Sequence, residues 1–168
     1  MEEERWATPH RDDVRRWLSV YQEMTALHEH MLDRVERGAP PDGDGSGAGS
    51  SSLAWARERR DYWRRRWLGL AGLAYDRGRR RLSSGGRSRA LSGREAQLLE
   101  LLLDHPDRVF TRRQLLTLAW GDEELSEEQV RNYVVRLRHK LADLGARCEL
   151  KSYFRQGYAL VLDDGGKL

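Results

Sequence analysis

The sequence predicts an α+β fold in which an α-helical hairpin precedes three further helices and a C-terminal β-hairpin. Heptad-spaced apolar residues near the N-terminus predict the helical hairpin. Within residues 91–162, three helix-start patterns each place a hydroxyl side chain three residues before Glu or Gln. The two side chains can then bond the free N–H groups of a helix's first turn. The patterns are Ser92-x-x-Glu95, Thr111-x-x-Gln114 and Ser126-x-x-Gln129, and a short pair of alternating strand segments follows them.

Residues 1–37 predict one long N-terminal helix, which starts at Thr8-Pro9 because proline suits the first helical position. Its apolar and aromatic side chains recur at alternating steps of three and four residues, the a/d spacing of a helix that packs along another helix. They are Val14, Trp17, Tyr21, Met24, His28, Met31 and Val35. A helix of about 29 residues is about 44 Å long, so it needs a partner to bury this stripe.

A flexible Gly/Ser/Pro linker is predicted at residues 38–52, followed by a second helix at residues 53–67. One side of this second helix carries Leu53, Ala56, Trp63 and Trp67. We expect the second helix to fold back on the first, and two such hairpins from two chains would form a four-helix dimerisation bundle. Two alternatives remain open: the hairpin docks on another protein, or its aromatic side chains line a ligand pocket.

The third capped helix, from Glu127 to about Asp143, has one apolar and one polar face. Its apolar stripe consists of Val130, Val134, Leu137 and Leu141 and faces the other helices. The opposite face presents polar side chains and arginines. Arginine can bond guanine, asparagine can bond adenine, and valine can contact the thymine methyl group. The candidate base contacts are Arg131, Asn132, Val135 and Arg136.

Several sequence motifs reach from the first capped helix to the end of the strand pair. They are Leu91-Ser-x-x-Glu95, Arg108-Val-Phe-Thr-Arg-x-Gln-Leu-Leu116, Trp120-Gly121, Val130, Arg136-Leu-Arg-x-Lys-Leu141 and Gly157-Tyr158. With these motifs, residues 68–162 resemble the winged helix-turn-helix effector domain of OmpR/PhoB-type response regulators, and residues 163–168 form a tail. The resemblance implies a small N-terminal β-sheet, for which Leu73–Asp76, Arg79–Leu82 and Arg89–Leu91 are the candidate strands.

The resemblance also implies roles for individual residues. Arg136 matches the family's base-reading arginine, and Arg138 matches a phosphate contact. Arg112 resembles an arginine that positions the DNA backbone, while His139 is a further phosphate candidate on the groove-facing side of its helix. Trp120 resembles a tryptophan whose indole N–H reaches a phosphate; the alternative is a loop anchor packed on the core.

The wing departs from the family pattern. The family typically has Thr-Val-Arg-Gly-x-Gly-Tyr, whereas this chain has Ser152-Tyr-Phe-Arg-Gln-Gly-Tyr158. The arginine of the wing, Arg155, therefore stands one position later in this chain than in the family pattern. Arg155 and Gln156 are the candidates for contacts to the minor groove, and Phe154 at the usual arginine position has no explanation from the sequence.

Charge and composition favour a nucleic-acid partner and an intracellular location. Residues 53–90 contain twelve arginines against three acidic side chains, next to the first capped helix, although the net charge of the chain is only +3. Such a block adds sequence-independent attraction to phosphates. The alternative interpretation is that the block only reflects composition, because this chain uses arginine for nearly all its basic residues. The lone Cys148 excludes an intrachain disulfide and suits the cytoplasm.

No motif indicates an enzyme, a metal site or a bound cofactor. His28 and His30 lie two residues apart on a helix, so they cannot ligate one metal as residues four apart can. The sequence also lacks a P-loop and a nucleophile–base pattern, and it has no secretory signal or membrane span.

The function predicted from the sequence is that of a cytoplasmic, sequence-specific transcriptional regulator. It binds double-stranded DNA as a homodimer and is not controlled by receiver phosphorylation, because residues 1–67 are too few for a receiver domain. The alternative is an adaptor whose N-terminal helices dock on a signalling protein or RNA polymerase, with weak DNA binding.

Overall fold

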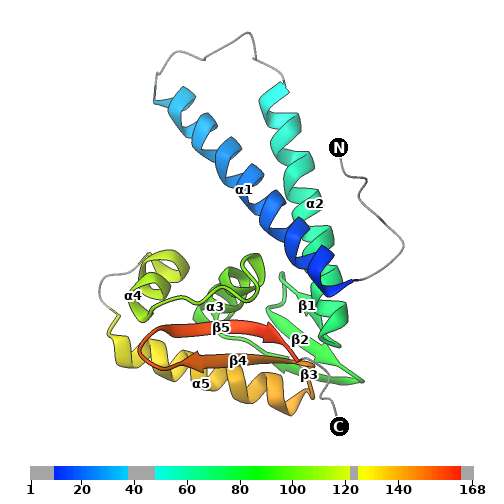
Figure 1. The fold of residues 1–168 in the computed structure, drawn as a ribbon, viewed down its shortest axis with the longest axis vertical. Coiled ribbons are helices and arrows are strands. Elements are labelled where there is room, and N and C mark those ends of the chain that lie inside the picture. Colours follow the sequence, from blue (N-terminus) through cyan, green and yellow to red (C-terminus); the bar gives the residue numbers. More distant parts are fainter. Residues whose placement is uncertain (1–9, 38–47, 122–124, 164–168) are drawn as a thin grey trace. The chain divides into compact units, whose positions relative to one another are not determined.

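A computed structural model describes residues 10–37, 48–121 and 125–163. The chain divides into two compact units, residues 1–66 and residues 67–168 (Figure 1). The first unit contains helix α1 (Arg11–Glu36) and most of helix α2 (Ala48–Leu70). The expected helix start at Thr8-Pro9 lies outside the described residues.

The second unit is the predicted winged helix. It begins with a three-stranded antiparallel sheet in the order β1-β2-β3. Helices α3, α4 and α5 follow, and α4 continues as the π-helix η1. The hairpin β4-β5 closes the unit. The elements are β1 (Ala74–Asp76), β2 (Arg81–Ser84), β3 (Arg87–Ala90), α3 (Gly93–Asp104), α4 (Arg112–Leu115), η1 (Leu116–Trp120), α5 (Glu127–Asp143), β4 (Cys148–Tyr153) and β5 (Gly157–Leu162).

All three capping boxes form as predicted. Ser92, Thr111 and Ser126 accept hydrogen bonds from the backbone of the third helical residue, and the side chains of Glu95, Gln114 and Gln129 bond back to the cap. The predicted stripe of α5 is buried along its whole length. It joins a core built from the leucines of α3, Leu115 of α4 and the inward-facing residues of the wing.

Two strands of the small sheet are displaced from their expected positions. The strand expected at Arg79–Leu82 is observed at Arg81–Ser84, because Asp76 and Arg80 lengthen the preceding turn. The Asp76 carboxylate accepts a hydrogen bond from the Arg79 N–H, and Arg80 adopts a left-handed φ of 48°. Since β2 is displaced, its partner β3 pairs two residues earlier than expected, at Arg87–Ala90.

A buried ion pair links α3 to α5 within the winged unit. Glu95 is 2% exposed and lies 2.5 Å from the ammonium group of Lys140, which also donates to the carbonyl of Ala90. Burial alone would raise the pKa of Glu95, but the hydrogen bonds from Lys140 and Ser92 outweigh burial and hold this pKa below its ordinary value. The first capping box is therefore also a tertiary link.

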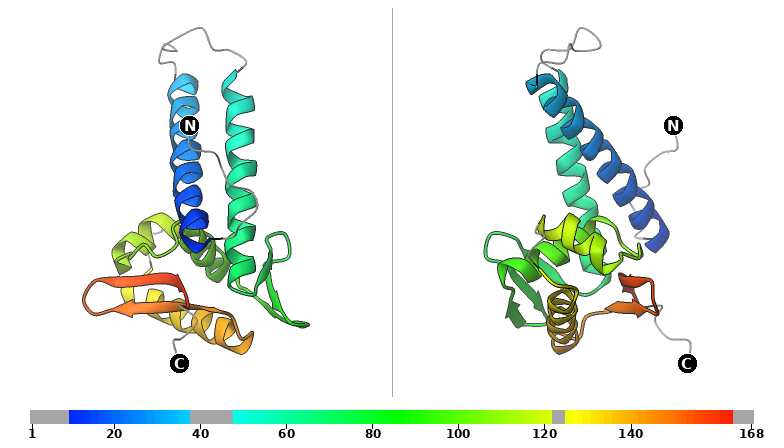
Figure 2. Two further views of the ribbon diagram at one scale, coloured as in Figure 1. Left: turned by 45° about the vertical axis from the view of Figure 1, so that its right-hand side comes forward. Right: turned by 90° about the vertical axis from the view of Figure 1, so that its left-hand side faces the viewer.

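In the first unit, α1 and α2 run alongside one another in opposite directions (Figure 2). Trp17 stacks on Trp63 with ring centroids 6.3 Å apart, and Tyr21 meets Trp55 edge-on at 5.6 Å. An ion pair between Glu29 and Arg57 at 2.8 Å joins the helices further along. Aromatic contacts therefore join the two helices, beside the buried aliphatic residues Val14, Leu18 and Leu53.

The buried stripe of α1 differs from the stripe predicted for it. Val14 and Tyr21 are buried as expected, and the other buried side chains among those described in α1 are Leu18 and Thr25. Thr25 can be buried because its hydroxyl donates to the carbonyl of Tyr21, 2.7 Å away. Trp17, Met24 and His28 are half-buried and Met31 is 54% exposed, whereas the side chain of Val35 lies outside the described residues.

Helix α2 is longer than expected. It starts at Ala48, inside the segment predicted as linker, and it ends at Leu70. Serine and glycine can occupy this first turn because each lowers helix propensity by only about 1 kcal/mol or less relative to alanine. Leu53, Ala56, Trp63 and Trp67 are all buried, although Trp67 falls in the second unit.

None of the helices in the described part of the chain has the length and apolar character needed to cross a bilayer.

Candidate nucleic-acid interface

The outward face of α5 presents the predicted base-contacting residues. Because the four apolar residues of the stripe turn inward, Arg131, Asn132 and Arg136 are exposed and Val135 is half-buried. The Arg136 guanidinium lies 5.8 Å from the centre of the Tyr133 ring. No residue in the described part of the chain forms an ion pair with Arg136, so its donors are free to contact another molecule. His139 is also exposed, one turn further along.

Arg138 is positioned differently from Arg136. It is half-buried, its Nε and Nη2 atoms donate to the carbonyl of Leu150 at 3.0 and 2.8 Å, and Nη2 also reaches the Ser152 hydroxyl at 2.8 Å. These bonds link α5 to β4. The residue assigned to a phosphate by resemblance therefore also fixes the wing relative to α5.

Arg112 stands at the first position of α4, next to the start of α5. Its Nη1 atom donates to the carboxylate of Glu127, 3.1 Å away. Hydrogen bonding with Tyr158, together with the bond to Glu127, raises the pKa of Arg112 above its ordinary value. Arg112 therefore contacts both the wing and α5.

A groove of about 690 Å³ separates the start of α4 from the tip of the wing. Arg112 and Arg113 line one side of the groove, and Phe154, Arg155 and Gln156 line the other. Sequence reasoning did not include Arg113 among the site residues. Its position beside Arg112 at a capped helix start was the signal that could have identified it.

The wing tip is a tight turn with an aromatic residue at its outer end. The Gln156 N–H donates to the carbonyl of Tyr153 at 3.0 Å, and Arg155 has a left-handed φ of 55°. Phe154 is 84% exposed, and the Arg155 guanidinium lies 5.1 Å from the centre of its ring. The two predicted minor-groove residues, Arg155 and Gln156, are both exposed.

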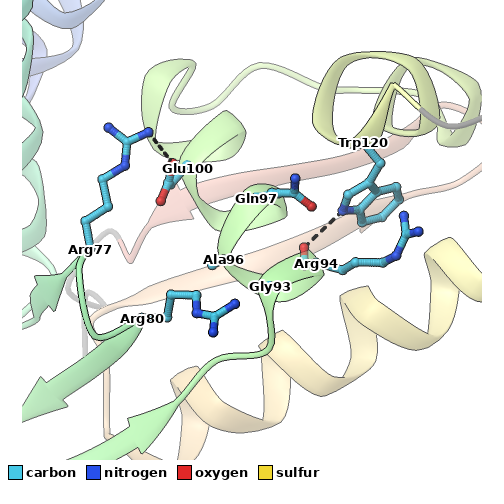
Figure 3. Close-up of a pocket in the computed structure, with 8 residues that line it drawn as sticks. All are labelled: Arg77, Arg80, Gly93, Arg94, Ala96, Gln97, Glu100 and Trp120. Atoms are coloured by element: carbon cyan, nitrogen blue, oxygen red, sulfur yellow. Dashed lines mark hydrogen bonds and ion pairs between the residues drawn. The ribbon is translucent and has the colours of Figure 1, made fainter.

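Trp120 lies at the edge of a second pocket, of about 510 Å³, close to the N-terminus of α3 (Figure 3). Its indole N–H donates to the carbonyl of Arg94 at 3.0 Å, and its ring packs 5.4 Å from that of Tyr133. This geometry is that of a loop anchor, the alternative to a phosphate contact. Arg77, Arg80 and Arg94 surround the pocket, and Arg77 pairs with Glu100 at 2.9 Å. Arg77 and Arg80, from the arginine-rich segment 53–90, thus line the same pocket as Trp120.

Comparisons with known proteins agree on the identity of the second unit. Residues 86–160 match the family model described as "Transcriptional regulatory protein, C terminal". The heme response regulator HssR of Staphylococcus haemolyticus (strain JCSC1435) is 37% identical over 81 residues, which are 48% of this chain and 36% of that protein. HssR of Staphylococcus aureus (strain bovine RF122 / ET3-1) is 35% identical over 78 residues, 46% of this chain and 35% of that protein.

This chain thus spans about a third of the length of these curated relatives. Among solved structures, the DNA-binding domain of E. coli CadC aligns with a TM-score of 0.50 and 21% identity, covering 55% of this chain and 89% of that one. That similarity concerns the fold alone and agrees with the winged helix described above. Residues 86–160 of the second unit therefore match the OmpR/PhoB-type family of transcriptional-regulator DNA-binding domains.

Proposed function

We propose that this chain is a cytoplasmic, sequence-specific transcriptional regulator that inserts α5 into the major groove of double-stranded DNA. The observation that supports this most strongly is the free outward face of α5. There Arg131, Asn132 and Arg136 are exposed, whereas Arg138 is bonded to the wing. Exposed arginine and asparagine side chains on a rigid helix can bond guanine and adenine edges in two places each. Selection of bound sequences from random duplexes tests the proposal; recovery of no shared motif would contradict it.

Backbone contacts are assigned to the surfaces on either side of α5. Arg112 and Arg113 at the start of α4 and Arg155 and Gln156 on the wing line one groove, so they could follow the two edges of a bound duplex. His139 and Arg138, through its remaining donors, are further phosphate candidates, whereas the single indole N–H of Trp120 already donates to the carbonyl of Arg94. Replacement of one true phosphate contact should weaken binding equally on all sequences and lower the salt-dependence slope by about one.

We also propose that the chain binds DNA as a homodimer through α1. Next to its buried stripe, α1 carries a second set of apolar residues at steps of four, three and four: Val20, Met24, Leu27 and Met31. At 3.6 residues per turn, this second stripe lies about a third of a turn around the helix from the buried one. Leu27 is 58% exposed and Met31 is 54% exposed. An exposed heptad stripe is what an antiparallel or parallel helix pair between two copies would bury.

The mass of the purified chain in solution tests the dimer. Trp17 stacks on Trp63, so its replacement would also disturb the hairpin. Leu27→Asp combined with Met31→Asp acts on the exposed stripe alone, and His30→Asp adds a single carboxylate off the stripe as a control. The double variant should be monomeric and lose cooperative binding to paired half-sites, while the control stays dimeric. If the wild-type chain is monomeric at tens of micromolar, the dimer is wrong and the stripe fits another protein, such as a signalling partner or RNA polymerase.

We further propose that DNA binding does not require phosphorylation of this chain. The described residues of the first unit form two helices and contain no strand that could end in a phospho-accepting aspartate. Treatment with acetyl phosphate should leave both mass and DNA affinity unchanged. An acid-labile phosphoryl adduct accompanied by tighter binding would contradict this proposal.

A further inference from the structure

Phe154 is the most exposed large hydrophobic side chain in the described part of the chain. It is 84% exposed, whereas the others are at most 58% exposed. It belongs to the turn from Tyr153 to Gln156 that reverses the chain at the tip of the wing. A large apolar group at such a point has no role in the core of the winged unit. It is therefore available to another molecule.

The turn that carries Phe154 is fixed relative to α5. The backbone of Tyr158 exchanges two hydrogen bonds with that of Phe110, at 2.8 and 2.9 Å, which holds the base of the wing against the start of α4. A side chain at Gly157 would collide with the Phe110 carbonyl, since its Cβ would lie 1.9 Å from that oxygen. The Arg138 bonds to Leu150 and Ser152 hold β4 against α5 from the other side. The tip is thus preorganised.

The chemistry around Phe154 selects for a polyanion that contains aromatic rings. The Arg155 guanidinium lies 5.1 Å from the ring centre, and Arg112 and Arg113 face the same groove. Arg112 is already paired with Glu127, but an apolar protein surface would have to desolvate Arg113 and Arg155 without compensation. A DNA minor groove offers negative potential to the arginines and base steps between which an apolar side chain can insert.

We propose that Phe154 is a wedge that inserts between two base pairs from the minor groove, kinks the duplex and favours an easily unstacked step at that position. This inference rests on the proposed function, because it requires α5 to dock the wing beside the minor groove. Pyrimidine–purine steps such as TA and CA/TG unstack most readily, so they are the steps that Phe154 favours. Phe154, which stands where the OmpR/PhoB-type family usually has arginine, would then contribute to recognition by deforming the DNA.

The test uses the full chain and the duplex recovered by selection, with dyes at both ends so that energy transfer reports the bend. The wild-type protein should bend the duplex by about 20° or more. It should also prefer a TA step at the wing position over a GC step. Phe154→Ala should lose the bend and the step preference and about tenfold in affinity. Phe154→Leu keeps an apolar wedge and should retain most of the bend, whereas Phe154→Arg should bind within a few-fold of wild type without bending.

Thermal unfolding of all four proteins should coincide, because Phe154 is exposed. A straight wild-type complex, or an equal bend in the Phe154→Ala complex, overturns the wedge proposal. The proposed function is still supported in that case if the chain binds the selected duplex specifically. If the wild-type chain binds selected and random duplexes equally, the proposed function fails and the wedge fails with it.

Discussion

The winged unit and the helical hairpin bury their apolar residues in different ways. In the winged unit, three completed capping boxes fix the helix starts, and the apolar stripe of α5 is entirely inside. In the hairpin, α1 carries two neighbouring apolar stripes, of which one is packed and the other leaves Leu27 and Met31 exposed. Trp55 of α2 is 48% exposed as well. The winged unit therefore covers the stripe of α5 by itself, and its exposed large apolar side chains, Leu118, Tyr153 and Phe154, lie outside that stripe, whereas α1 leaves part of a regular stripe uncovered.

The first consequence concerns stability and carries the largest expected effect. Leu137 is fully buried in α5, so Leu137→Ala should lower the free energy of unfolding by about 2–5 kcal/mol. Leu27→Ala, the same truncation on the exposed face of α1, should change it by no more than about 0.5 kcal/mol in the monomer. Urea denaturation followed by circular dichroism measures both. Equal losses would mean that the two units are packed alike.

The Glu95–Lys140 ion pair should make the stability of the winged unit depend on pH. Because the pKa of Glu95 is lower in the folded state, the pair contributes stability above the ordinary glutamate pKa, and this contribution disappears as the pH falls through the folded-state value. Lys140→Met leaves the carboxylate buried without its cation and should cost about 1–3 kcal/mol at pH 7.

Acidification should reverse part of that loss, because the unpaired Glu95 can then take up a proton. Adding Glu95→Gln to Lys140→Met provides the control: the double variant should recover stability at pH 7 and lack the acid-dependent component. A stability curve of Lys140→Met parallel to that of wild type between pH 4 and 7 would show that the pair is not coupled to folding.

Cys148 gives the smallest effect, a change in reactivity rather than in stability. Burial is the main reason that the pKa of this thiol is raised to about 12, with a further contribution from Asp163. At pH 8 the native thiol is therefore almost entirely protonated, and a disulfide reagent such as Ellman's should react with it only slowly. The same reagent should titrate one thiol per chain at once in denaturant. Rapid reaction of the native protein would show that the β4 end of the core opens readily.

The same division explains how much the sequence could predict. Local patterns determine a helix that is both capped and amphipathic, so the starts of α3, α4 and α5 and the buried face of α5 were predicted correctly. The buried face of α1 depends on which neighbour covers it. Thr25 is polar, so an apolar pattern does not predict its burial; the hydrogen bond of its hydroxyl to its own helix is what allows it.

Tertiary hydrogen bonds in the candidate site were beyond sequence reasoning. Residue types and spacing indicated that Trp120 and Arg138 matter, but not that the indole would bond the carbonyl of Arg94 or that the guanidinium would bond β4. Both bonds join residues whose approach depends on the assembled fold. Arg136 and Asn132, in contrast, follow directly from the helical periodicity of α5, so their exposure could be predicted.

Binding of DNA by Arg136→Ala and Arg138→Ala tests the central claim, that the outward face of α5 recognises base sequence. Affinities for the selected duplex and for a random duplex are compared, with unfolding measured alongside. Arg136→Ala should weaken binding to the selected duplex by about 1–3 kcal/mol and relax the preference at one base pair. Its stability should remain that of wild type, whereas Arg138→Ala should lose stability because its bonds to β4 are removed. An equal loss for Arg136→Ala on both duplexes would contradict the claim, since it would make Arg136 a phosphate contact only.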